Sequence, residues 1–184
     1  MVKNKLDPAS LTFRHAVAAD AVAIAELVNS AYRGESSKQG WTTEADLLQG
    51  QRINAQEVQT IIATDGSVIF LCLHDNTMIG CVNLERTGDA AYLGLFVVRP
   101  DLQGANIGKT FMQAAEAQAQ KLWGVKKMWM TVISVRKELL AYYQRRGYVI
   151  TGEISDFPFA NDKEIALVEN LQFEHLEKLL PAIT

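Results

Sequence analysis

The sequence is poor in the residues that build disulfide frameworks and metal sites. It contains two cysteines and three histidines in 184 residues. A single pair of cysteines does not form the disulfide scaffold that small secreted domains use. His15, His74 and His175 are scattered along the chain, without ligand spacing to each other or to the cysteines. We therefore expect no metal site.

Long apolar runs and an excess of basic residues are missing as well. No apolar run approaches the roughly 20 residues that a membrane-spanning helix requires. The N-terminal residues carry positive charge with no apolar segment after them, which argues against a secretory signal and predicts a cytoplasmic protein. The net charge is −3 and the pI is about 5.6, so we expect neither nucleic acid nor a membrane as a partner.

The remaining composition is that of a globular protein. Hydrophobic residues make up 48% of the chain and charged residues 21%, which is enough to build a buried core. The sequence shows no internal repeat, low-complexity tract or linker. We therefore predict one domain over residues 1–184, with residues 1–9 as a flexible tail.

Patterns of apolar residues predict the order of the secondary-structure elements. Three of the strands expected before residue 100 follow one another through tight turns, which predicts an antiparallel meander. The last of them, followed by a helix and a further strand, predicts a parallel pair in the same sheet. The expected strands cover residues 11–15, 68–74, 78–86, 92–98, 128–133, 148–154 and 165–176. The expected helices begin at Asp20 and near residue 43, and cover residues 57–63, 107–122 and 138–146.

Two features between these elements have more than one interpretation. Residues 34–44 are polar, punctuated by glycine and carry Trp41, so they form either a functional loop or a surface connection anchored by the indole. Cys72 and Cys81 fall on two strands joined by a short turn, and residue parity places both side chains on the same sheet face. We interpret them as reduced, buried thiols rather than as a redox pair.

The most informative stretch is a strand, a polar loop and a helix between residues 92 and 122. Tyr92 to Val98 is a short apolar run that ends before Pro100, which is typical of a buried strand. Apolar residues then recur at helical spacing from Ile107 onwards. The first turn of a helix has free backbone N–H groups and partial positive charge, so the loop at residues 103–108 predicts a seat for phosphate.

This loop resembles the acetyl-CoA pyrophosphate loop of the GNAT superfamily of N-acetyltransferases. The matching pattern is Val98-x-Pro100-x-x-Gln103-Gly104-Ala105-Asn106-Ile107-Gly108-Lys109. It departs from the family at Asn106, where glycine is usual. Asparagine is among the few residues that tolerate a left-handed backbone, so the departure is mild if the position needs one. The resemblance implies that acetyl-CoA is bound by Phe96, Val97, Val98, Gln103, Gly104, Ala105, Asn106, Ile107, Gly108 and Lys109.

A second motif is similar to the same family. Tyr142-Tyr143 is followed four residues later by Gly147-Tyr148, and the resemblance implies that Tyr143 protonates the departing coenzyme A thiolate. A phenol with a pKa near 10 can donate to a thiolate whose conjugate acid has a pKa of about 8.5. Adjacent helical side chains diverge by roughly 100 degrees, so we expect only one of the two tyrosines to face the cleft.

The resemblance implies an α+β fold whose central, mixed, mostly antiparallel sheet has six to seven strands flanked by helices. It also implies transfer of an acetyl group from acetyl-CoA to a primary amine of a small molecule or a peptide, without a metal. An alternative is a catalytically weakened module that binds acetyl-CoA as a sensor, and a more distant one is an unrelated nucleotide-binding domain. Whether the protein forms a homodimer is left open.

The general base is missing from the pattern. Tyr92 stands where some members have a catalytic glutamate, and Arg136 stands where many have an asparagine. The candidate proton acceptors are Glu35, Glu44, Glu85 and Asp89, directly or through a water, with Tyr92 as a relay. Bulk buffer is a further candidate if the cleft is open. Candidates for contact with the coenzyme phosphates are Lys126, Lys127, Arg145 and Arg146. The resemblance further implies that the loops with Gly40-Trp41-Thr42 and with Phe157-Pro158-Phe159 border the acceptor site.

Overall fold

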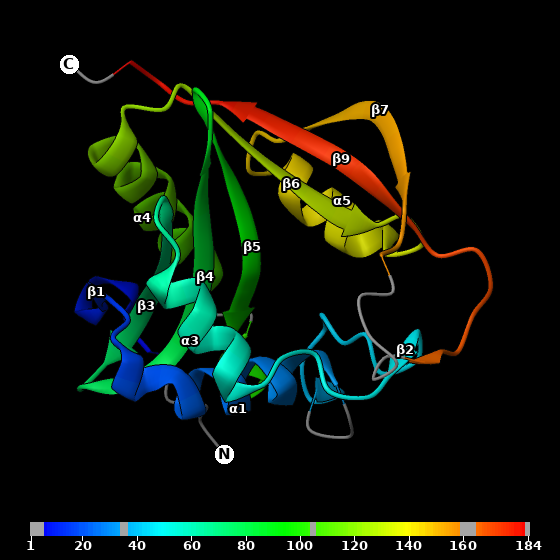
Figure 1. The fold of residues 1–184 in the computed structure, drawn as a ribbon, viewed down its shortest axis with the longest axis horizontal. Coiled ribbons are helices and arrows are strands. Elements are labelled where there is room, and N and C mark those ends of the chain that lie inside the picture. The colour runs from blue at the N-terminus through cyan, green and yellow to red at the C-terminus, as the bar shows by residue number, and fades with distance from the viewer. Residues whose placement is uncertain (1–5, 34–36, 104–105, 159–164, 183–184) are drawn as a thin grey trace.

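Figure 1 shows the computed structural model of the protein, which describes residues 6–33, 37–103, 106–158 and 165–182. The helices are α1 (Ala21–Tyr32), α3 (Ala55–Ala63), α4 (Ile107–Trp123) and α5 (Lys137–Gln144). The strands are β1 (Thr12–His15), β2 (Leu48–Gln49), β3 (Ser67–His74), β4 (Thr77–Thr87), β5 (Ala90–Val98), β6 (Lys127–Ile133), β7 (Val149–Asp156), β8 (Ile165–Ala166) and β9 (Gln172–Leu179).

Seven of these strands form one mixed sheet in the order β1-β3-β4-β5-β6-β9-β7. Neighbouring strands are antiparallel except β5 and β6, which α4 connects as a crossover. The turn between β3 and β4 is tight because Asp75 and Asn76 both adopt a left-handed backbone, with φ of 48° and 60°. The predicted α+β fold with a mostly antiparallel sheet is confirmed.

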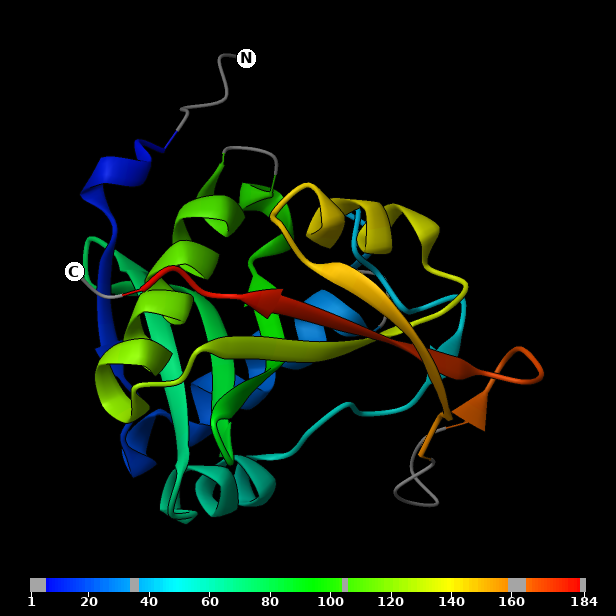
Figure 2. The same ribbon diagram turned by 90° about the horizontal axis from the view of Figure 1, so that it is seen from above.

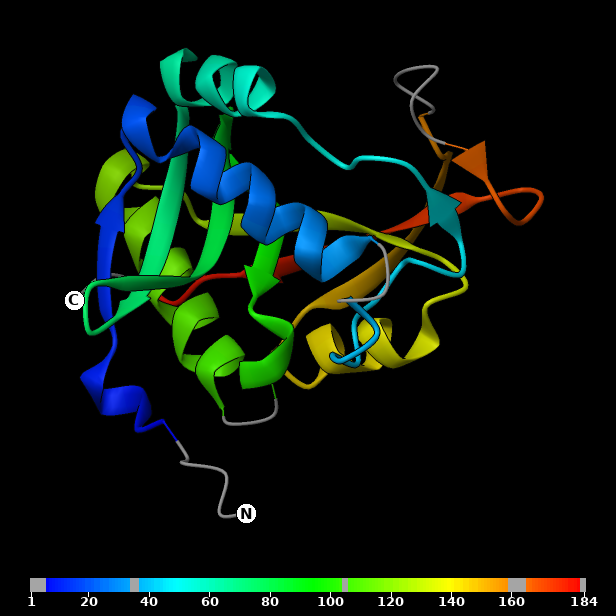
Figure 3. The same ribbon diagram turned by 90° about the horizontal axis from the view of Figure 1, so that it is seen from below.

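The helices lie on both faces of the sheet. Figures 1 and 2 show α1 and α3 on one face and α4 and α5 on the other. Figure 3 shows α1 running across the strands, where it contacts β4 and β5. Its expected apolar stripe is buried, from Ile24 to Ala31. On the opposite face, Phe111 and Ala115 of α4 are fully buried in a second cluster. None of the described helices is long and apolar enough to cross a membrane.

The two parallel strands at the centre of the sheet separate along their length. β5 and β6 pair only over three positions, and the last pair is Tyr92 with Trp129. Beyond Tyr92, no strand among the described residues pairs with the edge of β5 that faces β6. A register shift between β4 and β5, together with a φ of 48° at Leu95, marks a bulge in this part of β5. The fork between β5 and β6 positions the candidate site.

Three expectations about the elements are wrong. In place of the short helix expected near residue 43, residues 45–47 form a turn that leads into β2. The strand expected over residues 165–176 is divided into β8 and β9, because bends at residues 167–170 and a φ of 54° at Asn170 interrupt it. The expected tail is partly structured, since Leu6 packs against the core and Pro8–Ser10 forms a 3-10 turn. That residues 1–184 form one domain stays a prediction.

The expected placement of the two cysteines is also wrong. Cys72 pairs with Gly80 and Cys81 pairs with Leu71, so the two thiols point to opposite faces of the sheet. The cause is a bulge beside Cys72, which adds a residue to β4 and reverses the parity that a regular hairpin would give. Both thiols are reduced and buried, as expected.

Candidate active site

A cleft of about 520 Å³ opens at the fork between β5 and β6. Its walls come from β5, the N-terminus of α4, α5, the end of α1 and the segment at residues 41 and 42. The predicted site residues that line it are Phe96, Val97, Val98, Gln103, Asn106, Gly108, Lys109 and Tyr143. Ile107 is buried in the core beneath the cleft and does not line it. The expectations for Gly104 and Ala105 lie outside the described residues.

The start of α4 is built as a seat for an anion. Asn106 caps the helix with a left-handed backbone, φ 63°, so this position requires the conformation that asparagine tolerates. Gly108 and Lys109 of the first helical turn line the cleft, and the backbone N–H groups of a first turn have no partner within the helix. A Cβ atom on Gly108 would lie 2.6 Å from Tyr142 Oη, so glycine is needed for close packing at this point.

The free edge of β5 carries carbonyl groups that bind side chains instead of a strand. Tyr32 Oη donates to the Phe96 carbonyl at 3.4 Å, and Gln103 Nε2 donates to the Val98 carbonyl at 3.1 Å. In an extended strand the N–H and C=O of one residue point to the same side. The backbone amides of Phe96 and Val98 are therefore directed into the cleft. Nothing in the sequence pattern pointed to Tyr32, which looked like the end of an amphipathic helix.

Tyr143 lies deep in the cleft wall and is 6% exposed. Burial raises the pKa of its phenol far above the usual value, and the neighbouring Tyr32 and Tyr142 raise it further. Within the described part of the chain, the Tyr143 hydroxyl makes no hydrogen bond. It is therefore a protonated donor whose hydrogen is available to a ligand in the cleft.

Both tyrosines of the pair line the cleft, so the expectation that only one of them does is wrong. Their rings are 5.4 Å apart and nearly perpendicular. Tyr143 points towards the core, where it packs on Tyr148, whereas Tyr142 packs on Trp41 at a ring distance of 5.0 Å. Side chains of adjacent helical residues diverge by roughly 100 degrees, but the cleft is wide enough around this turn of α5 for both Tyr142 and Tyr143 to line it.

Cations surround the mouth of the cleft. Arg145 and Arg146 line it, as does Lys109, whereas Lys126 and Lys127 do not. The Arg146 guanidinium lies 3.2 Å from the centre of the Tyr142 ring and donates to the Tyr142 carbonyl at 2.8 Å. Lys127 is bound to Glu177 at 2.7 Å, on the far side of the fork. The cluster supplies positive charge where the phosphates of a nucleotide coenzyme would lie.

The segment around Trp41 borders the cleft and also docks onto it, so both interpretations of this segment hold in part. The Trp41 backbone N–H donates to Gln103 Oε1 at 3.0 Å, and Gln103 Nε2 also reaches Thr42 Oγ1 at 3.1 Å. A Cβ atom on Gly40 would lie 2.5 Å from Gln103 Oε1. Residues 40–42 therefore lie directly over the pyrophosphate-loop glutamine.

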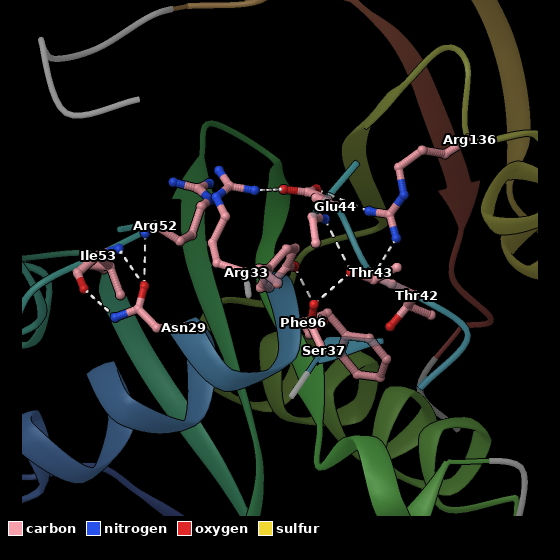
Figure 4. A network of polar contacts seen from close by, with 12 residues as sticks. Asn29, Arg33, Ser37, Thr42, Thr43, Glu44, Arg52, Ile53, Phe96 and Arg136 are labelled. Atoms are coloured by element: carbon pink, nitrogen blue, oxygen red, sulfur yellow. Dashed lines mark hydrogen bonds and ion pairs between the residues drawn. The ribbon is translucent and has the colours of Figure 1, made fainter. Parts of the chain in front are cut away.

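Glu44 is a structural carboxylate and not the free base that the sequence suggested (Figure 4). It is 7% exposed, with Oε1 bound to Arg136 at 2.9 Å and Oε2 bound to Arg33. The Arg136 Nη2 also donates to the Thr42 carbonyl at 2.5 Å. Asn29 lies beside this network and fixes the chain at residues 52 and 53.

The other proton acceptors suggested by the sequence lie away from the cleft or outside the described residues. Glu85 and Asp89 are exposed on the β4–β5 hairpin, and Glu35 lies outside the described part. The Tyr92 ring packs on Trp129 at 4.6 Å, and its hydroxyl lies 3.4 Å from Thr131 Oγ1. Glu138, in the first turn of α5, is the carboxylate that lines the cleft among the described residues.

Of the second loop expected at the acceptor site, Phe157 and Pro158 do not line the cleft. Phe157 packs on Phe173 at 5.0 Å in a small cluster below β2, and it does not line the cleft. Phe159 lies outside the described residues. Within the described part of the chain, no three histidine, cysteine, aspartate or glutamate side chains converge as a metal site would require.

Comparisons with known proteins agree with this geometry. The model of the acetyltransferase (GNAT) family matches residues 22–148. No curated protein matches the sequence significantly. Similar solved structures include an IAA acetyltransferase from Bacillus cereus, with a TM-score of 0.67 at 18% identity over 93% of this chain and 100% of that one.

Two further structures have ligands in their descriptions. A GNAT family acetyltransferase from Elizabethkingia anophelis with acetyl-CoA bound has a TM-score of 0.66 at 15% identity, over 93% of this chain and 99% of that one. A spermidine N-acetyltransferase from Vibrio cholerae in complex with CoA and spermine has a TM-score of 0.67 at 16% identity, over 93% and 96%. These likenesses concern the fold. The family model covers more than half of the sequence, and the chain belongs to the acetyltransferase (GNAT) family.

Proposed function

We propose that this protein transfers the acetyl group of acetyl-CoA to a primary amine by direct attack of the amine on the thioester. The single observation that carries the proposal is the convergence of the predicted pyrophosphate-loop residues and Tyr143 on one cleft at the β5–β6 fork. These residues come from a strand, a helix start and a second helix. Chance packing would not be expected to bring an anion seat, a free strand edge and a buried phenol into one cavity.

The cleft provides each contact that a coenzyme A thioester needs. The first turn of α4, with Gly108 and Lys109, offers backbone amides and a cation to the pyrophosphate. The free edge of β5 at Phe96 and Val98 offers strand-like hydrogen bonds to the two amides of the pantetheine arm. Gln103 is held by the segment at residues 41 and 42 and would exchange these partners for the coenzyme.

The proposed chemistry follows from the position of these groups. The amine nitrogen forms a bond to the carbonyl carbon, and the bond from that carbon to sulfur breaks. A backbone N–H of β5 near Phe96 stabilises the negative charge that develops on the carbonyl oxygen. The Tyr143 hydroxyl donates its proton to the departing sulfur. Because burial raises the pKa of Tyr143, the phenol keeps its proton until negative charge develops on the sulfur.

The proton of the incoming ammonium leaves through water in the open cleft. Glu44 has both carboxylate oxygens in ion pairs, and Glu85 and Asp89 lie outside the cleft. Glu138 lines the cleft but is exposed to the same water. An alkylammonium group has a pKa of about 10.4, so at pH 7 roughly one amine in 2,500 is free to react. This route needs no protein base, and it makes the reaction faster as the pH rises.

Calorimetric titration with acetyl-CoA, with ATP and NAD as controls, tests the coenzyme site. Selective binding followed by release of free thiol with a panel of primary amines would support the proposal. The panel includes alkylamines, diamines, amino acids and short peptides, because the acceptor is not specified by the cleft. Selective binding without turnover of any amine would favour the sensor module, and binding of ATP or NAD in place of acetyl-CoA would refute both.

A further inference from the structure

One buried carboxylate joins the two walls of the cleft. Glu44 binds Arg33 at the end of α1 through Oε2 and binds Arg136 at the start of α5 through Oε1 (Figure 4). The side chains of Glu44, Arg33 and Arg136 are 8%, 6% and 10% exposed. At such burial, ion pairs hold a fixed geometry and are weakly screened by salt.

On the first wall, Glu44 is tied to the strand edge where the thioester is proposed to lie. The Glu44 backbone N–H donates to the Tyr32 carbonyl at 3.1 Å. The Tyr32 hydroxyl in turn donates to the Phe96 carbonyl at 3.4 Å. The position of Glu44 is therefore fixed relative to the free edge of β5.

On the second wall, Arg136 is tied to the helix that carries the proposed acid. Arg136 is the N-cap of α5, and its carbonyl accepts from the amides of Leu139 and Leu140, both at 3.1 Å. Tyr143 is seven residues further on. Arg136 and Tyr143 both line the cleft, and the Arg136 charge acts on the Tyr143 phenol, where it partly offsets the rise in pKa that burial causes.

Arg136 also binds a backbone carbonyl on the opposite side of the cleft. Its Nη2 donates to the Thr42 carbonyl at 2.5 Å, and Thr42 Oγ1 accepts from Gln103 Nε2 at 3.1 Å. One guanidinium thus connects α5 to Glu44 and, through Thr42, to the pyrophosphate loop. The guanidinium of Arg136 is planar and has several N–H donors in fixed positions, so it can make both contacts at once. A lysine ammonium is a single point of charge.

We propose that Arg136 is a positioning residue for acetyl transfer. Its ion pair with Glu44 and its hydrogen bond to the Thr42 carbonyl fix the position of α5, so that the Tyr143 hydroxyl faces the free edge of β5 at Phe96. This inference rests on the proposed function, because it concerns the placement of the proposed acid. Arg136 acts through Tyr143 and does not itself touch the reacting atoms. Loss of these two contacts shifts the Tyr143 hydroxyl relative to the leaving sulfur and leaves the first turn of α4, the proposed pyrophosphate seat, in place.

The test compares Arg136→Met, Arg136→Lys and the matched control Lys137→Met, which removes the exposed cation next along the chain. Each is assayed for kcat and KM with acetyl-CoA and an amine that the wild-type protein acetylates, and for calorimetric affinity for acetyl-CoA. Misplacement of a catalytic group by about 1 Å can cost on the order of 100-fold in rate. We expect Arg136→Met to lower kcat at least about tenfold and acetyl-CoA affinity by less than about threefold, and Arg136→Lys to fall in between. Lys137→Met should match the wild type.

A double-mutant cycle separates positioning from general damage to the fold. The Arg136→Met change is repeated in a Tyr143→Phe background, where the acid is already gone. If Arg136 acts by placing Tyr143, the change has little further effect on kcat in that background. If it acts only by holding the fold together, kcat falls by the same factor in both backgrounds, and the proposal is overturned.

The remaining outcomes also decide the question. If urea unfolding shows that Arg136→Met is not folded, Arg136→Lys carries the test, because it keeps the charge opposite Glu44. Unchanged kcat in every folded Arg136 variant overturns the inference while the proposed function stands. A wild-type protein that acetylates no amine overturns the proposed function, and that failure is seen before any variant is made.

Discussion

Tyr142 Oη occupies the space that a side chain on Gly108 would need, because a Cβ atom there would lie 2.6 Å away. A Gly108→Ala change should therefore push the Tyr142 ring out of the cleft wall and narrow the entry to the first turn of α4. We expect weaker binding of acetyl-CoA with a smaller effect on kcat at saturation. The measurement is the calorimetric affinity for acetyl-CoA.

The matched control for Gly108→Ala is the same change in a Tyr142→Phe background. Removing the hydroxyl removes the atom that clashes, so the second protein should recover most of the lost affinity. Equal losses of affinity in the two backgrounds would show that the methyl group obstructs the coenzyme directly and not through Tyr142.

Tyr143→Phe removes the proposed acid and keeps the buried ring. General acids contribute on the order of 100- to 10,000-fold, so we expect kcat to fall within this range while affinity for acetyl-CoA changes little. Steady-state kinetics and calorimetry on the same preparation provide both quantities. Tyr142→Phe, which alters the neighbouring phenol, should retain most of the turnover. A large loss of affinity with unaltered turnover would contradict the acid role.

The pH dependence of the reaction follows from two groups. The acceptor ammonium must lose its proton, so kcat/KM should rise with pH towards the pKa of the amine, about 10.4 for an alkylamine. Because burial raises the pKa of Tyr143, the acid stays protonated over this interval and should not cause an alkaline decline. A profile of kcat/KM against pH checks this, after enzyme stability at each pH has been verified. A plateau with an apparent pKa near 7 would instead reveal a protein base.

The buried thiols of Cys72 and Cys81 should make the fold sensitive to alkali. Burial raises the pKa of each thiol from 9.0 to about 12. Since the unfolded state loses these protons first, the stability they contribute is complete below about pH 9 and is lost as the pH rises towards about 12. Urea midpoints measured across this interval should fall, and less steeply in a Cys72→Ala/Cys81→Ala protein. Thiol reagents should modify both cysteines only after denaturation, and rapid reaction of the native protein would contradict their burial.

Glu44→Ala should destabilise the fold strongly. The change removes the carboxylate that Arg33 and Arg136 both contact, and removal of one partner from a buried ion pair costs about 3–5 kcal/mol. The free energy of unfolding in urea measures the effect. Glu26→Ala, which removes an exposed carboxylate from α1, provides the control and should change stability by less than about 0.5 kcal/mol. A similar loss in both variants would show that the buried network contributes little.

Local patterns along the chain were sufficient for most elements and for the coenzyme loop. The strand, loop and helix at residues 90–123 are contiguous, so their apolar periodicity and the residues Gln103, Asn106 and Gly108 specify them without distant contacts. The left-handed backbone of Asn106 could be anticipated because few other residues adopt it at low cost. Tyr143 could be identified because the motif around it is also short and continuous.

Features that depend on strand register or on contacts between distant residues could not be predicted from local patterns. One bulge in β4 reversed the parity of Cys72 and Cys81, and no local pattern marks where a bulge will form. Glu44 looked like a solvated acid until the fold brought Arg33 and Arg136 to its two oxygens. A charge pattern says nothing about partners that are 92 residues apart in the chain.

The sequence by itself determined the family and the order of the main elements, and it was enough to propose the residues of the pyrophosphate loop, because all of these depend on neighbours along the chain. Only the tertiary structure decided how the cleft is closed. It placed Tyr32 on the edge of β5, the segment at residues 40–42 over Gln103, and Arg136 between Glu44 and Thr42. Those contacts arise from the parting of β5 and β6, which reflects the balance of packing over the whole sheet and is not encoded in any short stretch.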